Sequence, residues 1–245
     1  MTHLTIVQLY PDELGVAGDR GNVMALRTRL ENAGQTVTVV AHEVGSQLPT
    51  DIDLLVVGSG PLSAMRNIHQ DLMAIGDRLR DLRTQGMTVF AYGSGAELLG
   101  RSITLQDGTV MPGLEILPFS ASRVPSRAVG YIAVDSPFGR IVGFEDNAST
   151  WTLEPTAQPL GLLEVGVGNG IGSVEGVQAE AAIGTQIGGP VLPLNPVLTD
   201  AIIDLIATRR GFQAKYSEAN ARLDSYAANA REVIITHSKH VFSRI

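Results

Sequence analysis

A short apolar segment that runs into a glycine-rich turn, Met87–Gly100, has the pattern of a corner that carries a catalytic nucleophile. Met87–Tyr92 is predicted to be a buried strand, Gly93-Ser94-Gly95 a tight turn, and Ala96–Leu99 the start of a helix. A side chain at such a corner projects from the carboxyl edge of the sheet, where backbone N–H groups can stabilise a developing negative charge. The corner residue is Gly93, and the chain contains no cysteine. The sequence therefore predicts a nucleophile elbow without its nucleophile.

Ser94 is the hydroxyl residue that remains at this corner. A serine hydrolase needs a histidine to accept the hydroxyl proton and an acidic residue to orient that histidine. The segment YGSGA does not match G-x-S-x-G, because its glycines adjoin the serine instead of standing two residues away. The histidines are expected away from this corner, and the last two have no further ligand beside them, so no metal site is expected. They are His3, His42, His69, His237 and His240.

The composition limits the class of protein to which the chain can belong. Of its 245 residues, 44% are hydrophobic and 18% are charged, and the net charge of −7 gives no reason to expect nucleic-acid binding. The chain shows no basic segment followed by a long apolar run, and no stretch of about eighteen apolar residues, so we expect no signal peptide, no membrane span and a cytoplasmic location. The absence of cysteine excludes disulfides and thiolate metal sites, and we expect no cofactor.

The first part of the chain alternates between apolar strands and amphipathic helices. The apolar run DIDLLVVG is typical of a strand in the middle of a parallel sheet. This order of elements predicts a doubly wound α/β sheet that ends in the corner strand. The predicted strands are Leu4–Tyr10, Thr36–Val40 and Asp51–Gly58, and the predicted helices are Gly21–Gly34 and Leu62–Gln85.

After Gly100 the chain changes to short β segments separated by turns. Asp107-Gly108 predicts a hairpin, and the later segments predict strands on a second face of the same domain. The glycine-rich stretch Gly166–Gly172 lacks the spacing G-x-G-x-x-G and has no helix pattern behind it, which favours a plain turn over a phosphate-binding loop. The predicted strands are Tyr131–Val134, Gly139–Phe144, Leu162–Val165 and Ile183–Pro190.

Two helices are predicted at the C-terminal end. Asn195-Pro196 starts the first, with the asparagine as N-cap, and Gly211 ends it. The second runs from Ser217 to about Ser243, and its apolar seam must pack on the body of the protein or on a partner. We divide the chain into a domain, residues 1–210, and a helical extension, residues 211–245. The seam comprises Leu223, Ala227, Ala230, Ile234, His237 and Val241.

Five segments, in the same order along the chain, resemble the GatD subunits, which are class I glutamine amidotransferases of the CobB/CobQ type. The resemblance implies a class I glutamine amidotransferase-like doubly wound sheet with helices on both faces, followed here by a long C-terminal helix. It also implies a partner, the Mur-ligase-like ATP-dependent subunit MurT. In this family GatD releases ammonia from glutamine, and the pair amidates the D-glutamate of the lipid II stem peptide. The segments are Pro11–Gly34, Asp107–Phe119, Phe138–Asn147, Gly168–Gly176 and Ile183–Pro196.

The resemblance further implies which positions should carry the chemistry. In the family a cysteine attacks the glutamine amide, a histidine moves the proton, and backbone N–H groups hold the oxyanion. The family elbow C-G-G-Y-Q-L-L-G aligns with GSGAELLG, which puts Gly93 at the cysteine position. The family motif T-Y-L-H-G-P aligns with TQIGGP, which puts Gly188 at the histidine position. The oxyanion loop aligns with Gly58-Ser59-Gly60, and Arg127 matches an arginine near the substrate glutamine.

These replacements indicate a natural pseudo-amidotransferase with no catalytic residue of the family type, because neighbouring residues are changed as well. Loss of the nucleophile alone lowers kcat by roughly 10⁶ in a triad enzyme. The main hypothesis is a non-catalytic subunit of a MurT-like Mur ligase. One alternative is a hydrolase that uses Ser94. Another is a sensor that binds L-glutamine or glutamate in a vestigial pocket made by Arg127, Ser94, Gly58 and Gly60.

Overall fold

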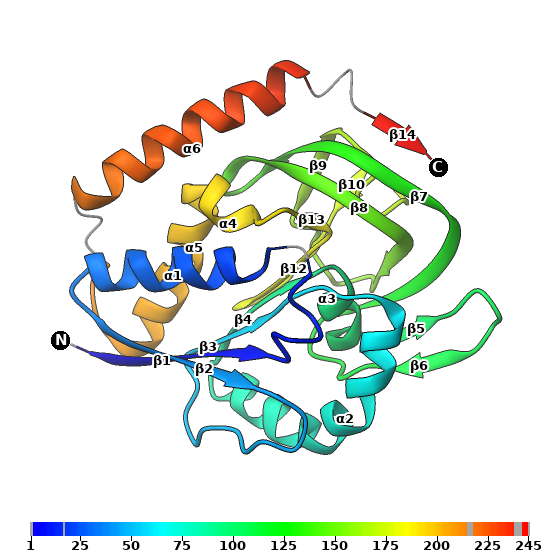
Figure 1. The fold of residues 1–245 in the computed structure, drawn as a ribbon, viewed down its shortest axis with the longest axis horizontal. Helices are drawn as coiled ribbons and strands as arrows, with labels where there is room; N and C mark the ends of the chain where they lie inside the picture. The colour runs from blue at the N-terminus through cyan, green and yellow to red at the C-terminus, as the bar shows by residue number, and fades with distance from the viewer. Residues whose placement is uncertain (1, 17, 215–217, 238–241, 245) are drawn as a thin grey trace.

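The computed structural model describes residues 2–16, 18–214, 218–237 and 242–244, which form two β-sheets with helices packed around them (Figure 1). The first sheet has the strand order β11-β12-β4-β3-β1-β2, in which all neighbours are parallel except β11 and β12. Its strands are β1 (His3–Leu9), β2 (Thr36–His42), β3 (Leu54–Val57), β4 (Thr88–Tyr92), β11 (Val177–Ala179) and β12 (Ala182–Thr185).

Helices cover both faces of the first sheet. α1 (Arg20–Asn32) and α5 (Pro196–Arg210) bury apolar side chains against one face, and α2 (Leu62–Thr84) buries them against the other. Every residue of β3 is buried, as expected for a strand in the middle of a parallel sheet. The predicted doubly wound α/β fold is therefore confirmed. No helix in the described parts of the chain is long and apolar enough to cross a bilayer.

The second sheet is built from the segment predicted to hold short strands. Asp107-Gly108 lies in the turn of an antiparallel hairpin, as predicted. β7 and β8 are 18 and 15 residues long, far longer than predicted. Part of each strand is polar and lacks a clear alternation of apolar and polar residues, and the pairing of the two strands shifts register between Arg123 and Ala128. The strands are β5 (Ser102–Thr104), β6 (Val110–Pro112), β7 (Phe119–Ser136), β8 (Gly139–Leu153), β9 (Gly161–Val165), β10 (Val174–Glu175), β13 (Ile187–Gly188) and β14 (Phe242–Arg244).

The predicted corner is present where the two sheets meet. β4 runs directly into α3 (Gly93–Leu99), and β12 lies beside β4 with Thr185 opposite Tyr92. Beyond β12 the chain passes into the second sheet as β13, in which Gly188 pairs with Phe144 of β8. The elbow therefore faces side chains from both sheets.

The C-terminal helices differ from the predictions in two respects. Asn195 does not cap α5 with its side chain, because its Oδ1 accepts from Val142 N at 2.9 Å and its Nδ2 donates to Val142 O at 2.8 Å. Gly211 ends α5 in the left-handed conformation, as predicted. α6 (Glu218–His237) stops before Ser243, since Phe242–Arg244 pairs with β7 as β14. The short helix α4 (Val191–Leu194) precedes α5.

Candidate functional site

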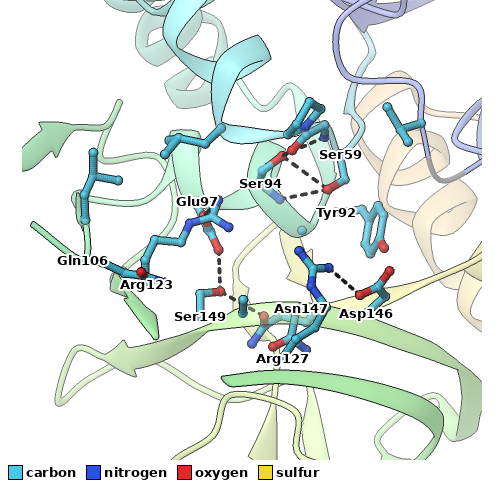
Figure 2. Close-up of a pocket in the computed structure, with 18 of the residues that line it drawn as sticks. Ser59, Tyr92, Ser94, Glu97, Gln106, Arg123, Arg127, Asp146, Asn147 and Ser149 are labelled. Atoms are coloured by element: carbon cyan, nitrogen blue, oxygen red, sulfur yellow. Dashed lines mark hydrogen bonds and ion pairs between the residues drawn. The ribbon is translucent and has the colours of Figure 1, made fainter. Parts of the chain in front are cut away.

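A cavity of about 890 Å³ opens at the carboxyl ends of β3 and β4, where they meet the second sheet (Figure 2). Open α/β sheets bind ligands at this edge, and the volume is that of a ligand pocket. Side chains of both charges line it together with amides and hydroxyls. They are Ser59, Arg66, Tyr92, Ser94, Glu97, Gln106, Asp107, Arg123, Arg127, Asp146, Asn147, Ser149 and Gln186.

Gly93 stands at the corner itself, as the first residue of α3. Its φ of +52° lies in the left-handed region, where a glycine costs little and other residues are strained. A Cβ added to Gly93 would lie 2.6 Å from Ser59 Oγ. The backbone N–H of Ser94 donates to this same oxygen at 3.2 Å. The hydroxyl of Ser59 therefore fills the space in front of the corner.

The hydroxyl of Ser94 is engaged in hydrogen bonds that tie the corner to the loop after β3. Ser94 Oγ accepts from Gly60 N at 2.8 Å and donates to Gly60 O at 2.9 Å, with Ser59 Oγ at 3.3 Å (Figure 2). None of the four histidines within the described residues lines the cavity, and His240 lies outside those residues. In this geometry Ser94 is a structural link, and no imidazole of the described residues is placed to activate it.

We expect Ser94→Ala to leave ester hydrolysis unchanged at the background rate, because the hydroxyl has no histidine base among the described residues. The substitution removes the hydrogen bonds to Gly60 and is expected to lower the free energy of unfolding by about 1–2 kcal/mol. Hydrolysis of a p-nitrophenyl ester and urea unfolding measure the two effects. The exposed Ser63→Ala is the matched control. Hydrolysis by the wild type that disappears in Ser94→Ala would instead establish a serine hydrolase.

Tyr92 occupies the space beside Gly188. A Cβ added to Gly188 would lie 2.1 Å from Tyr92 Oη and 2.4 Å from its Cζ, so no larger residue fits while the ring stays in place. Tyr92 is 6% exposed, and its hydroxyl has no hydrogen-bond partner among the described residues. Desolvation, together with the charge of Asp146 and other carboxylates, raises the pKa of Tyr92, so the hydroxyl is neutral at physiological pH. The cavity thus presents a phenol at this point.

The other predicted binding residues, Arg127, Gly58 and Gly60, interact with neighbouring parts of the same chain. Arg127 lines the cavity, but its guanidinium is paired with Asp146, and both side chains are about half exposed (Figure 2). A Cβ on Gly58 or Gly60 would approach a backbone oxygen of the 13–14 segment to within 2.4 Å or less, so both glycines allow close packing of two loops. Gly60 lines the cavity, whereas Gly58 does not.

Glu97 is the centre of a buried polar network that the sequence analysis missed. Its Oε2 accepts from Arg123 Nη2 at 2.6 Å, and its Oε1 accepts from Ser149 Oγ at 2.5 Å and from Trp151 Nε1 at 3.4 Å. The Glu97 side chain is 3% exposed. The sequence did contain a signal for this network, because Glu97 lies inside the apolar run AELL. A carboxylate that is buried with such a run requires hydrogen-bonding or charged partners. The network joins α3 to β7 and β8 across the floor of the cavity.

A comparison with family models decides which family the chain represents. Residues 5–195 match the CobB/CobQ-like glutamine amidotransferase domain. The chain belongs to this family. This match covers nearly all of the first sheet, the corner and the cavity. It ends at Asn195, before α5 and α6.

Two curated relatives of this amidotransferase family are similar over most of their length. The chain is 30% identical to the lipid II isoglutaminyl synthase (glutamine-hydrolyzing) subunit GatD of Staphylococcus aureus strain N315, over 240 residues and 96% of each chain. It is 26% identical to the subunit of the same name from Streptococcus pneumoniae strain ATCC BAA-255 / R6, over 82% of this chain and 79% of that protein. The resemblance to GatD subunits is thereby confirmed.

Solved structures of glutamine amidotransferases share the fold. One crystal structure of a glutamine amidotransferase matches with a TM-score of 0.55 and 17% identity, over 82% of this chain and 98% of the other. A second, from Thermotoga maritima, matches with a TM-score of 0.54 and 13% identity, over 95% and 93%. These likenesses confirm the class I glutamine amidotransferase-like architecture.

The glycine-rich turn of this amidotransferase-family domain holds a carboxylate of the protein. The backbone N–H groups of Val167 and Gly168 donate to the two oxygens of Glu145, at 2.8 and 3.0 Å. Successive backbone N–H groups of this kind form an anion-binding concavity. Because Glu145 occupies it, the turn serves the fold, in agreement with the predicted plain turn.

Glu175 gives the stability of the protein a predicted pH dependence. Burial raises its pKa from 4.5 to about 7, and the charge of Glu145 adds to the rise. The folded protein therefore holds this proton more tightly than the unfolded chain, and the resulting stability, complete below about pH 4.5, is lost as the pH rises through 7. Between about pH 5 and pH 8, urea unfolding should show a smaller loss of stability for Glu175→Gln than for the wild type. Equal losses would contradict this assignment.

Metal binding finds no support in the described residues. Within them, no group of three or more histidine, aspartate or glutamate side chains is arranged to hold an ion. His237 Nδ1 lies 2.8 Å from Val233 O, and His69 Nε2 lies 2.7 Å from Pro112 O. These histidines contact backbone carbonyls of the fold.

Proposed function

We propose that this chain is a cytoplasmic, non-catalytic GatD-like subunit that acts with a MurT-like Mur ligase in the amidation of lipid II. The observation that carries the proposal is a pair of filled spaces, with the Ser59 hydroxyl in front of Gly93 and the Tyr92 phenol against Gly188. The chain has no thiol to attack glutamine there, and no histidine of the described residues lines the cavity to move a proton. Similarity to the S. aureus GatD subunit along almost the whole chain supports the reaction context and the existence of a partner.

The test is to co-express the chain with the Mur-ligase-like subunit of the same organism and to purify the two together. We expect a stable complex that amidates lipid II with ammonium as the nitrogen source and not with L-glutamine. Failure to co-purify would overturn the proposed partnership. Amidation that depends on L-glutamine in the purified complex would overturn the proposed loss of catalysis.

A second candidate function is binding of L-glutamine or glutamate without hydrolysis. The observation in its favour is the Tyr92 side chain, which is 6% exposed and lines the cavity, and whose hydroxyl has no hydrogen-bond partner among the described residues. Arg127 can supply a cation for a ligand carboxylate only by loosening its pair with Asp146. Titration calorimetry with both amino acids tests this candidate, which requires heat that is lost in Tyr92→Phe. Absence of heat excludes it.

A further inference from the structure

The C-terminal helix α6 is attached to the body mainly through polar contacts. Asn32 Nδ2 donates to Asn220 Oδ1 at 2.7 Å, and Arg29 Nη1 donates to Asp224 Oδ1 at 2.6 Å. Further along, Arg231 contacts Asn195 and the backbone oxygen of residue 140. Ala227 is the one apolar residue of α6 that counts as buried in the described helix. Polar side chains thus dominate the face that α6 turns to its own domain.

The exposed side of α6 carries an apolar seam that differs from the predicted one. Of the predicted residues, Ala227 and Ile234 lie toward the body, Leu223, Ala230 and His237 are exposed, and the side chain of Val241 lies outside the described residues. The exposed residues of the observed seam recur in steps of four and three along the helix. They are Ala219, Leu223, Tyr226, Ala230, Val233 and His237, and the three largest apolar ones are 46%, 57% and 55% exposed.

An ordinary surface helix buries its apolar stripe and exposes its polar one. The inner face of α6 combines polar groups with Ala227, Ile234 and Ile235, while a second apolar stripe is left exposed. Solvent contact with Leu223, Tyr226 and Val233 is unfavourable, and apolar patches of a few hundred Å² on soluble proteins are often binding sites. The alternating steps of four and three are those of a seam that packs against another helix. The geometry therefore calls for a helical partner on this face.

The extent of the matches indicates which partner that is. The family match ends at residue 195, whereas the alignment with the S. aureus GatD subunit omits at most about ten residues of this chain and so includes most of α6. The helix is thus an addition that goes with the subunit relative and lies beyond the family domain. We infer that the observed seam of α6 docks an amphipathic helix of the ligase-like partner. This inference rests on the proposed function.

The charge beside the seam favours an acidic partner helix. A stable interface buries about 800 Å² on each partner, so a seam on one helix serves as one part of a larger contact. Arg222 Nε donates to Tyr226 Oη at 3.1 Å, which fixes the ring and puts a positive charge beside the seam. The partner helix is expected to carry a carboxylate opposite this arginine.

The absence of cysteine allows a site-specific test. Val233→Cys in the seam and Ala228→Cys on another exposed side of α6 each introduce a single thiol for an environment-sensitive fluorophore. Adding the purified ligase-like subunit should shift the emission of the label at position 233 and leave the label at position 228 unchanged. The double variant Leu223→Glu/Val233→Glu should weaken binding at least tenfold, whereas Ala221→Glu/Ala228→Glu should bind like the wild type. Circular dichroism establishes that both variants remain helical.

The outcomes separate this inference from the proposed function. If the wild type binds the ligase-like subunit and the seam variant binds equally well, the docking surface lies elsewhere and the inference is overturned, while the partnership stands. If the wild type does not bind, the partnership itself fails. If light scattering shows that the chain alone is a dimer that Val233→Glu dissociates, a second copy covers the seam and the inference is overturned.

Discussion

Glu97→Ala is expected to lower the free energy of unfolding by about 3–5 kcal/mol, because it removes one partner of a buried ion pair. The substitution leaves Arg123 without its carboxylate and takes an acceptor from Ser149, which is 3% exposed. Glu97→Gln keeps the shape and one acceptor, and we expect a smaller loss. Urea unfolding followed by circular dichroism measures both.

The pair of Arg127 and Asp146 provides the matched control at the same cavity. Both side chains are about half exposed, so Asp146→Ala should cost no more than about 1 kcal/mol. Similar losses for Glu97→Ala and Asp146→Ala would show that the Glu97 network does not hold the floor of the cavity together.

Gly188→His is expected to destabilise the protein by about 3 kcal/mol or more, because its Cβ overlaps the Tyr92 phenol at 2.1 Å. The double variant Gly93→Cys/Gly188→His should therefore not restore glutaminase activity, since the imidazole and the Tyr92 phenol compete for one space. Thermal unfolding and a glutamate-release assay measure the two consequences.

A double-mutant cycle isolates the steric cause. In a Tyr92→Ala background the additional cost of Gly188→His should fall to within about 1 kcal/mol, which corresponds to a coupling of at least about 2 kcal/mol. Additive effects of the two substitutions would mean that Tyr92 does not block position 188. Gly188 is not among the glycines with a left-handed backbone, so the cost of Gly188→His contains no contribution from a strained φ.

The order of elements and the corner were predictable because they follow from local signals. The apolar run that forms β3, the glycines that end α1 and α2, and the turn at Gly93 each specify their element without distant partners. The absence of a cysteine nucleophile could also be read directly from the sequence, since the chain contains no cysteine. These features account for the correct fold.

The contents of the cavity were not predictable in the same way because they depend on pairing between distant segments. Tyr92 meets Gly188 only because β12 pairs with β4 and the chain then turns into β13. Asn195 is a residue type that often caps helices, yet its side chain is hydrogen-bonded to the backbone of Val142 instead. The predicted apolar seam of α6 was placed on the wrong side of the helix. The spacing of apolar residues predicts that a helix has an apolar face, but packing on the body decides which face is buried.

The most direct test of the central claim is a glutaminase measurement on the purified chain, alone and with its ligase-like partner. The S. aureus GatD subunit, named for a glutamine-hydrolyzing synthase, is the positive control. We predict no glutamate from L-glutamine above the protein-free blank in either sample. Glutamate release at a rate comparable with that of the control would contradict the account, because the chain has no thiol and no histidine lines the cavity among the described residues.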